Sequence, residues 1–315
     1  MKKKIYGLTL AFAFLFLVAA GLMLFDSAGG TLDLKYLPEL TIKSDGSITP
    51  TTGYISRTGN VYTLTADIEG YAVRIDCSNI VFDGAEHTIH ASPAFVNSGL
   101  RLLQCDNVTV KNLAVIGDMY VSIFLTGSNC LITSVKTDAL RINSEGFNTI
   151  TASNVESLTL WRGSNLVSKC NISRIFLMDW SSSNVFTQNN FLLNSSTDGF
   201  SVETYSANFW DNGSVGNYWS DYAERYPNAS ELGSTGIVDT PYVIDADNVD
   251  YYPLMYPYDI ENDAIAFPTP EPQSSQSPEP QEQGIFPTAL VAVAFVATVA
   301  VVGVGLLVYF RKRKR

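Results

Sequence analysis

The sequence has few of the residues that bind transition metals. It contains two His and five Met among 315 residues, and Met1 and Met23 lie in the apolar N-terminal segment. His87 and His90 are three positions apart, which in a strand places them on opposite faces. Because copper binds through imidazole and soft sulfur ligands, the composition disfavours a copper site. The sequence predicts no metal and no cofactor.

Basic residues are scarce between the two ends of the chain. Eight of the 20 Lys and Arg lie in residues 2–4 and 311–315, so 12 remain against all 31 acidic residues and residues 26–284 carry a net charge of −19. Such a surface repels phosphates, which excludes nucleic acid as a partner. It could attract divalent cations, although a solvated acidic surface is the simpler interpretation.

Both ends are apolar. Residues 5–25 follow three Lys, so residues 1–30 indicate a signal peptide or an uncleaved signal anchor, and cleavage stays open. Residues 285–310 are uncharged and long enough to span the roughly 30 Å of a bilayer, and the basic tail 311–315 follows. By the positive-inside rule the tail is cytoplasmic and the middle of the chain extracytoplasmic. We expect one membrane span after cleavage and two without it.

Two further features fit an exported chain. Residues 259–284, rich in Pro, Glu, Gln and Ser, predict a semi-extended linker. Five sequons offer sites for N-glycosylation, although an Asn-rich chain generates such triplets by chance. They start at Asn107, Asn171, Asn194, Asn212 and Asn228.

A short unit recurs about every twenty residues between residues 71 and 207. Each copy has a polar turn with an Asn, followed by alternating apolar residues. The turn residues are Asn79, Asn107, Asn129, Asn148, Asn165 and Asn184, spaced 28, 22, 19, 17 and 19 apart. A unit this short cannot bury its own apolar face, so neighbouring copies must stack.

The alternation has period two, which is typical of strands. It predicts an all-β fold, a right-handed parallel β-helix over residues 71–207, with an N-terminal cap over 31–70 and an aromatic C-terminal cap over 208–258. A second series of turn positions supports this register, and Asn is expected to form a structural ladder at a corner. The second series is Asn112, Ser134, Asn154, Asn171 and Asn190.

The four Cys fall into two kinds. Cys77 and Cys105 both lie two residues before a turn Asn, so they should stack in adjacent coils. A disulfide between them and a pair of buried free thiols are equally compatible with that spacing. Cys130 and Cys170 lie in different registers about two coils apart and are expected in the core.

Several motifs resemble those of NosD-like surface β-helix proteins, which are abundant in archaea. They are Asn79-Ile80-Val81-Phe82-Asp83-Gly84, Gly216-Asn217-Tyr218-Trp219-Ser220-Asp221-Tyr222 and Asp239-Thr240-Pro241-Tyr242. The resemblance covers residues 41–257 and implies a fold shared with pectate lyases. The family takes its name from a protein of copper-site maturation, but a fold shared so widely fixes no activity.

The C-terminal block departs from that family in one respect. Many relatives carry an Asp-rich, calcium-loop-like run before the Asp-Thr-Pro-Tyr motif, whereas residues 228–236 lack those carboxylates, so the resemblance does not extend to calcium binding here. The aromatic side chains of the block can cover the open end of the helix or, alternatively, form a sugar-binding platform. They include Trp210, Trp219, Tyr218, Tyr222 and Tyr242.

Candidate chemistry within the coils is sparse. Asp138 with Arg141, or Asp179 with Arg162, could meet across coils, although isolated surface charges with an occasional salt bridge are the simpler interpretation. Trp161 and Trp180 occupy similar places in consecutive coils and are the candidate carbohydrate-binding residues, or else cover a bend.

These patterns favour a structural or glycan-recognition module that faces outward from the membrane and has no evident catalytic residues. A polysaccharide lyase or hydrolase is the first alternative, and a metal-handling accessory protein is the second.

Overall fold

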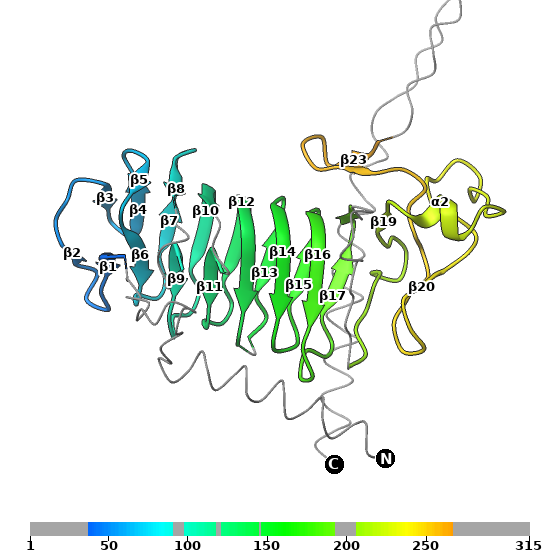
Figure 1. Cartoon of the computed structure of the whole chain (residues 1–315), viewed down its shortest axis with the longest axis horizontal. Helices are drawn as coiled ribbons and strands as arrows, with labels where there is room; N and C mark the ends of the chain where they lie inside the picture. Colours follow the sequence, from blue (N-terminus) through cyan, green and yellow to red (C-terminus); the bar gives the residue numbers. More distant parts are fainter. Residues whose placement is uncertain (1–36, 91–97, 118–120, 145, 193–205, 267–315) are drawn as a thin grey trace, which may run out of the picture. The chain divides into compact units, whose positions relative to one another are not determined.

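The computed structural model describes residues 37–90, 98–117, 121–144, 146–192 and 206–266. The chain divides into two compact units, residues 1–268 and 269–315, and every described residue lies in the first. The described residues form a β-solenoid of about six turns with almost no helix, in which the strands stack along one axis (Figure 1). This confirms the predicted all-β, parallel β-helix architecture.

The apolar segments 5–25 and 285–310 lie outside the described residues. Within the part of the chain that is described, no helix has the length and apolar character needed to cross a bilayer.

Each full turn contributes to three parallel strand ladders. The first ladder holds β4 (Val61–Leu64), β7 (Val81–Asp83), the starts of β10 (Thr109–Ile116) and β12 (Leu131–Ile142), β13 (Thr149–Thr151), β15 (Leu166–Ser168) and β17 (Val185–Thr187). The second holds β5 (Ile68–Glu69), β8 (Thr88–His90), the end of β10, the middle of β12, the starts of β14 (Asn154–Leu160) and β16 (Asn171–Leu177), β18 (Asn190–Phe191) and β19 (Tyr218–Trp219).

The third ladder carries the groove described below. It holds β1 (Glu39–Ile42), β6 (Ala72–Ile75), β9 (Leu100–Leu102), β11 (Ile123–Leu125) and the ends of β12, β14 and β16. Strands β1, β4 and β5 lie within residues 31–70, so the stretch expected as an N-terminal cap already contributes to the ladders.

The remaining elements lie at the two ends of the solenoid. β2 (Ile48–Thr49) and β3 (Ile55–Thr58) run antiparallel to β1 and β4. At the other end are α2 (Tyr222–Arg225) and the hairpins β20 (Tyr242–Val243) with β21 (Val249–Asp250) and β22 (Tyr258–Asp259) with β23 (Ala264–Ile265). The last hairpin includes the first residues of the expected linker. An ion pair between the Lys169 Nζ and the Asp263 Oδ1, 2.6 Å apart, connects this hairpin to the coils.

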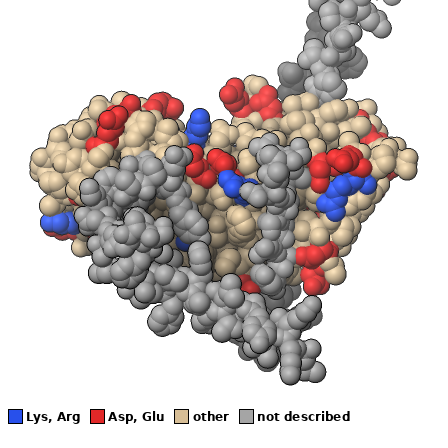
Figure 2. All heavy atoms as spheres, in the orientation of Figure 1, with Lys and Arg blue, Asp and Glu red and all other residues tan. Residues whose placement is uncertain are grey.

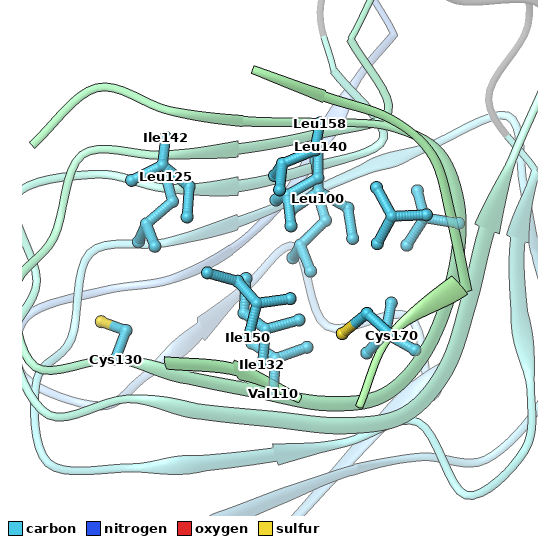
Figure 3. Packing of buried hydrophobic residues seen from close by; sticks show 14 of the residues in the cluster. Leu100, Val110, Leu125, Cys130, Ile132, Leu140, Ile142, Ile150, Leu158 and Cys170 are labelled. Carbon is cyan, nitrogen blue, oxygen red and sulfur yellow. The ribbon is translucent and has the colours of Figure 1, made fainter. Parts of the chain in front are cut away.

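The core consists of apolar side chains stacked from coil to coil. Because strand side chains alternate, every second residue points inward, and strand pairing aligns these residues into columns (Figure 3). Three such columns run Leu100-Ile123-Leu140-Leu158, Leu125-Ile142-Leu160 and Val110-Ile132-Ile150-Val167. Stacking therefore supplies the burial that no single coil could provide.

The observed register of the coils differs from the predicted one at the corners. Pairing aligns Val81, Thr109, Leu131, Thr149, Leu166 and Val185, a spacing of 28, 22, 18, 17 and 19 residues. The third interval is one residue shorter than the interval between the Asn residues. Asn79, Asn107 and Asn129 therefore occupy the left-handed corner position, whereas Phe147, Ser164 and Ser183 occupy it in the next three coils.

The second series of turns shows a similar shift. Asn112 and Ser134 have positive φ, as predicted, but the equivalent residues in the following coils are Ala152, Lys169 and Gln188. Asn154, Asn171 and Asn190 lie two residues further on, within strands that pair with one another. The prediction was wrong for the last three of these five positions, because a β-helix tolerates a one- or two-residue change in turn length at each corner.

The shift converts exposed turn residues into a buried column of Asn side chains, here called the long Asn column. The Oδ1 atoms of Asn165, Asn184 and Asn208 each accept hydrogen bonds from the backbone N–H and the Nδ2 of the Asn one coil earlier, for example Asn165 to Asn184 at 2.9 and 3.0 Å. At the end of the column, the Asn248 Oδ1 accepts from the Asn208 N–H and the Trp210 Nε1. The column comprises Asn148, Asn165, Asn184, Asn208 and Asn248, and all are buried. An Asn ladder was predicted, and the structure confirms it for three residues of the predicted series, Asn148, Asn165 and Asn184, and extends it to Asn208 and Asn248.

Phe147 provides a test of the corner geometry. It has a left-handed φ of 51° and is 73% exposed, a conformation that is costly for a bulky residue and well tolerated by Asn. We expect Phe147→Asn to raise the free energy of unfolding by about 1 kcal/mol, measured by urea denaturation. Asn129→Phe, at the matching position one coil earlier, should lower it by a similar amount; a destabilised Phe147→Asn variant would contradict this account.

Candidate functional site

A groove of about 580 Å³ lies on the outer side of the third ladder, over β12, β14 and β16. The alternation that sends Leu140, Leu158 and Ile175 into the core sends their neighbours outward into this groove. Pairing places Arg141, Thr159 and Phe176 side by side across the three strands. The groove is also lined by Asp138, Glu156, Trp161, Arg174 and Met178.

Two carboxylates lie on adjacent strands in this groove. Thr137 pairs with Val155 and Ala139 with Ser157, so Asp138 and Glu156 hold the same register in adjacent strands. Adjacent strands are about 4.8 Å apart, and both side chains also line a second hollow beside the groove. Asp138 and Arg141, which were expected to meet across coils, belong to the same strand, β12, and both line the groove.

Hydrogen bonds and ion pairs fix these side chains. Asp138 accepts a hydrogen bond from the Gly117 N–H at 2.7 Å, and Arg174 pairs with Glu156 at 2.6 Å. The Arg174–Glu156 pair is about half exposed, so it contributes little to stability. Its consequence is geometric, because it holds a carboxylate and a guanidinium at the wall of the groove.

The structure separates the two candidate Trp residues. Trp161 is half-buried and lines the groove, with the Arg141 guanidinium 5.9 Å from its ring centroid. Its buried Nε1 has no hydrogen-bond partner among the described residues. Trp180 is 63% exposed in the turn after β16, with Arg162 stacked over its ring at 5.1 Å. Only Trp161 therefore belongs to the groove.

Sequence reasoning missed the place of Phe176 in the groove and the pairing of Asp138 with Glu156, although Asp138 itself was a candidate residue. The strand register contained the information needed to find them, because equivalent residues of consecutive coils lie side by side. Finding them required the correct coil length at each turn, and the Asn-based register was shifted in these coils.

The aromatic side chains of the C-terminal block continue the core. The Trp210 ring stacks on Phe186 with centroids 4.5 Å apart, and Trp219 stacks between Phe191 and Tyr242 at 4.3 and 4.1 Å. Trp210, Trp219, Tyr222 and Tyr242 are buried, whereas Tyr218 is half-buried. Tyr218 and its neighbours also line a hollow of about 220 Å³ in the cap.

The remaining predicted residues are dispersed. Among the described residues no group of three or more His, Cys, Asp or Glu side chains is placed to hold a metal ion. All four Cys are free thiols. Of the sequons, Asn107, Asn212 and Asn228 are exposed, Asn171 donates to Asn154 at 2.6 Å, and Asn194 lies outside the described residues.

Charged side chains of both signs are scattered over the surface, and much of the described surface visible in Figure 2 is neither acidic nor basic. A scan against protein-family models, a search of curated proteins and a search of solved structures found no match to this chain.

Proposed function

We propose that this protein is a membrane-anchored, extracytoplasmic β-helix that recognises a glycan of the cell envelope in the groove of the third ladder. One observation carries the proposal, namely that aromatic rings and hydrogen-bonding charges converge there. Trp161 and Phe176 offer faces for the apolar side of a sugar ring, and Asp138, Glu156 and the two Arg offer partners for its hydroxyls.

The charge of the groove supports the same class of ligand. Asp138 and Glu156 are balanced by Arg141 and Arg174, whereas residues 26–284 together carry a net charge of −19. An acidic polysaccharide is therefore repelled less by the groove than by the rest of the surface, whereas a neutral polysaccharide is repelled by neither. The groove also crosses three strands, so an extended chain of several sugar rings would fit along it.

The anchoring part of the proposal rests on the sequence. The apolar run 285–310 with its basic tail supports a C-terminal span, and the motifs around Trp219 and Tyr242 support kinship with NosD-like surface proteins. A carbohydrate ligand outside the cell is compatible with both.

Replacing Trp161 tests glycan recognition. We expect Trp161→Ala to weaken binding of the full-length protein, kept in detergent, to a polysaccharide panel by tenfold or more, because the ring-stacking surface is lost. Trp180→Ala is the matched control and should change affinity less than twofold, since Trp180 lies outside the groove. Isothermal titration calorimetry measures both. Equal losses in the two variants, or no binding by the wild type, would refute the groove as the site.

A second candidate function is glycoside cleavage, favoured by the shared register of Asp138 and Glu156. Two carboxylates on adjacent strands can act as general acid and as base or nucleophile at one glycosidic bond. If the protein cleaves a polysaccharide, Asp138→Asn and Glu156→Gln should each lower kcat at least a hundredfold in a reducing-sugar assay.

Asp76→Asn provides the matched control for this assay. Asp76 pairs with Arg74 on the same ladder outside the groove, so its replacement should leave turnover unchanged. Binding without turnover, with and without calcium, would leave recognition as the function.

A further inference from the structure

Two of the four thiols meet in adjacent coils. Cys105 precedes β10 and Cys130 precedes β12, and both are buried, with exposed fractions of 0% and 2%. The Cys130 Sγ lies 3.7 Å from the Cys105 carbonyl oxygen, so the thiol of one residue reaches the backbone of the other. Cys170 is buried at the opposite side of the core from Cys130 (Figure 3).

Gly127 makes this approach possible. The Asp106–Ser128 bridge aligns Gly127 with Cys105 one coil earlier. A Cβ at residue 127 would overlap the Cys105 carbonyl and lie 3.2 Å from the Cys130 Sγ. The missing side chain therefore provides the space in which the Cys130 thiol approaches Cys105.

Cys77 has a different environment. It is aligned with Cys105 from the preceding coil, but it is only partly buried, and its Sγ lies 3.7 Å from the carbonyl oxygen of Ser78. The sequence spacing had paired Cys105 with Cys77, but the Cys77 thiol contacts Ser78. The thiol of Cys130, 25 residues after Cys105, contacts Cys105 itself.

We propose that Cys105 and Cys130 form a disulfide when the chain folds under oxidising conditions. One Sγ–Sγ bond forms and two S–H bonds break. The two electrons pass to a disulfide oxidant such as oxidised glutathione, which takes up the two protons and leaves as two thiols. The bond joins two neighbouring coils and closes the 24 residues of 106–129 into a loop.

The burial of the two thiols determines the stage of folding at which the disulfide forms. Burial shields both thiols from oxidants in the folded, reduced protein, because the exposed fractions of Cys105 and Cys130 are only 0% and 2%. The thiol–disulfide exchange therefore takes place while the coils that carry Cys105 and Cys130 are still assembling. The folded coils then protect the bond.

Counting thiols distinguishes this pairing from the alternatives. The full-length protein is refolded in detergent in a glutathione redox buffer, denatured without reductant, and titrated with Ellman's reagent. Of the four Cys, two should react in the wild type. Cys77→Ala should leave one reactive thiol and Cys130→Ala three, because Cys105 then loses its partner. Cys170→Ala, the matched control, should leave one.

The opposite pattern, three thiols in Cys77→Ala and one in Cys130→Ala, would assign the bond to Cys77 and Cys105 and overturn the proposal. Four reactive thiols in the wild type would overturn it as well. Non-reducing peptide mapping of the wild type by mass spectrometry identifies the linked peptides directly, so the test does not depend on the folding of any variant.

Stability provides an independent measurement. The oxidised wild type should melt roughly 5–10 °C above the reduced protein. The same comparison in Cys130→Ala should show no difference, and an equal shift in that variant would contradict the proposal.

Discussion

Replacing Asn184 with alanine is expected to lower the free energy of unfolding by about 3 kcal/mol. Asn184 lies in the middle of the long Asn column, where its Oδ1 accepts hydrogen bonds from the N–H and Nδ2 of Asn165 at 2.9 and 3.0 Å. Its Nδ2 donates to Asn208 and Ser181. Alanine leaves the Asn165 backbone N–H buried without a partner, whereas the Asn165 Nδ2 keeps its hydrogen bonds to the carbonyl oxygens of Arg162 and Gly163. The unpaired N–H costs about 1–3 kcal/mol, and the hydrogen bonds that the Asn184 Nδ2 donates are lost as well.

The matched control is Asn79→Gly. Asn79 occupies the exposed corner position with a φ of 59°, where glycine adopts the same conformation without strain. We expect a change of less than about 0.5 kcal/mol at this position. Urea denaturation followed by circular dichroism measures both variants, and equal losses would show that the column contributes no more than an exposed turn.

Raising the pH from 4 to 8 is expected to destabilise the C-terminal cap. Burial raises the pKa of Asp250 from 3.8 to about 7, although its carboxylate accepts hydrogen bonds from the Asn217 N–H at 2.8 Å and the Trp219 Nε1 at 2.9 Å. Asp250 ends a short Asn column made with Asn189 and Asn217. The protonated acid is therefore the form that the folded cap favours.

The sign of the effect follows from the pKa values of the two states. Because the folded-state pKa lies above that of the unfolded chain, the stabilisation is fully present below about pH 4 and is lost as the pH rises through about 7. The loss amounts to at most about 4 kcal/mol. Thermal melting between pH 4 and 8 measures it, and Asp250→Asn should remove most of the slope.

Asp259→Asn serves as the control for this pH series. A hydrogen bond from the Asn262 side chain lowers the pKa of Asp259. Titration of Asp259 therefore changes the stability of the fold only at acidic pH, below the range of the Asp250 effect. The control should keep the decline between pH 5 and 8. A decline that persists in Asp250→Asn would place its origin in another group.

The candidate site was only partly predictable. Trp161 was identified from its place in the coil, but Trp180 was grouped with it because both follow a strand end. The structure separates them, because Trp161 lies directly after β14 on the groove side whereas Trp180 lies in the turn beyond β16. A turn has no fixed side-chain direction, so sequence spacing cannot decide on which side an aromatic ring of a turn will lie.

The sequence by itself determined the fold class, because period-two apolar residues in units of about twenty cannot be buried except by stacking. It also determined that an Asn ladder would form. The identity of the buried Asn residues, the shared register of the carboxylates and the approach of Cys130 to Cys105 became visible in the folded structure alone. The physical reason is that side chains in a strand alternate, so one residue more or fewer in a turn moves a residue from the surface to the core. Only the pairing of neighbouring coils fixes that number.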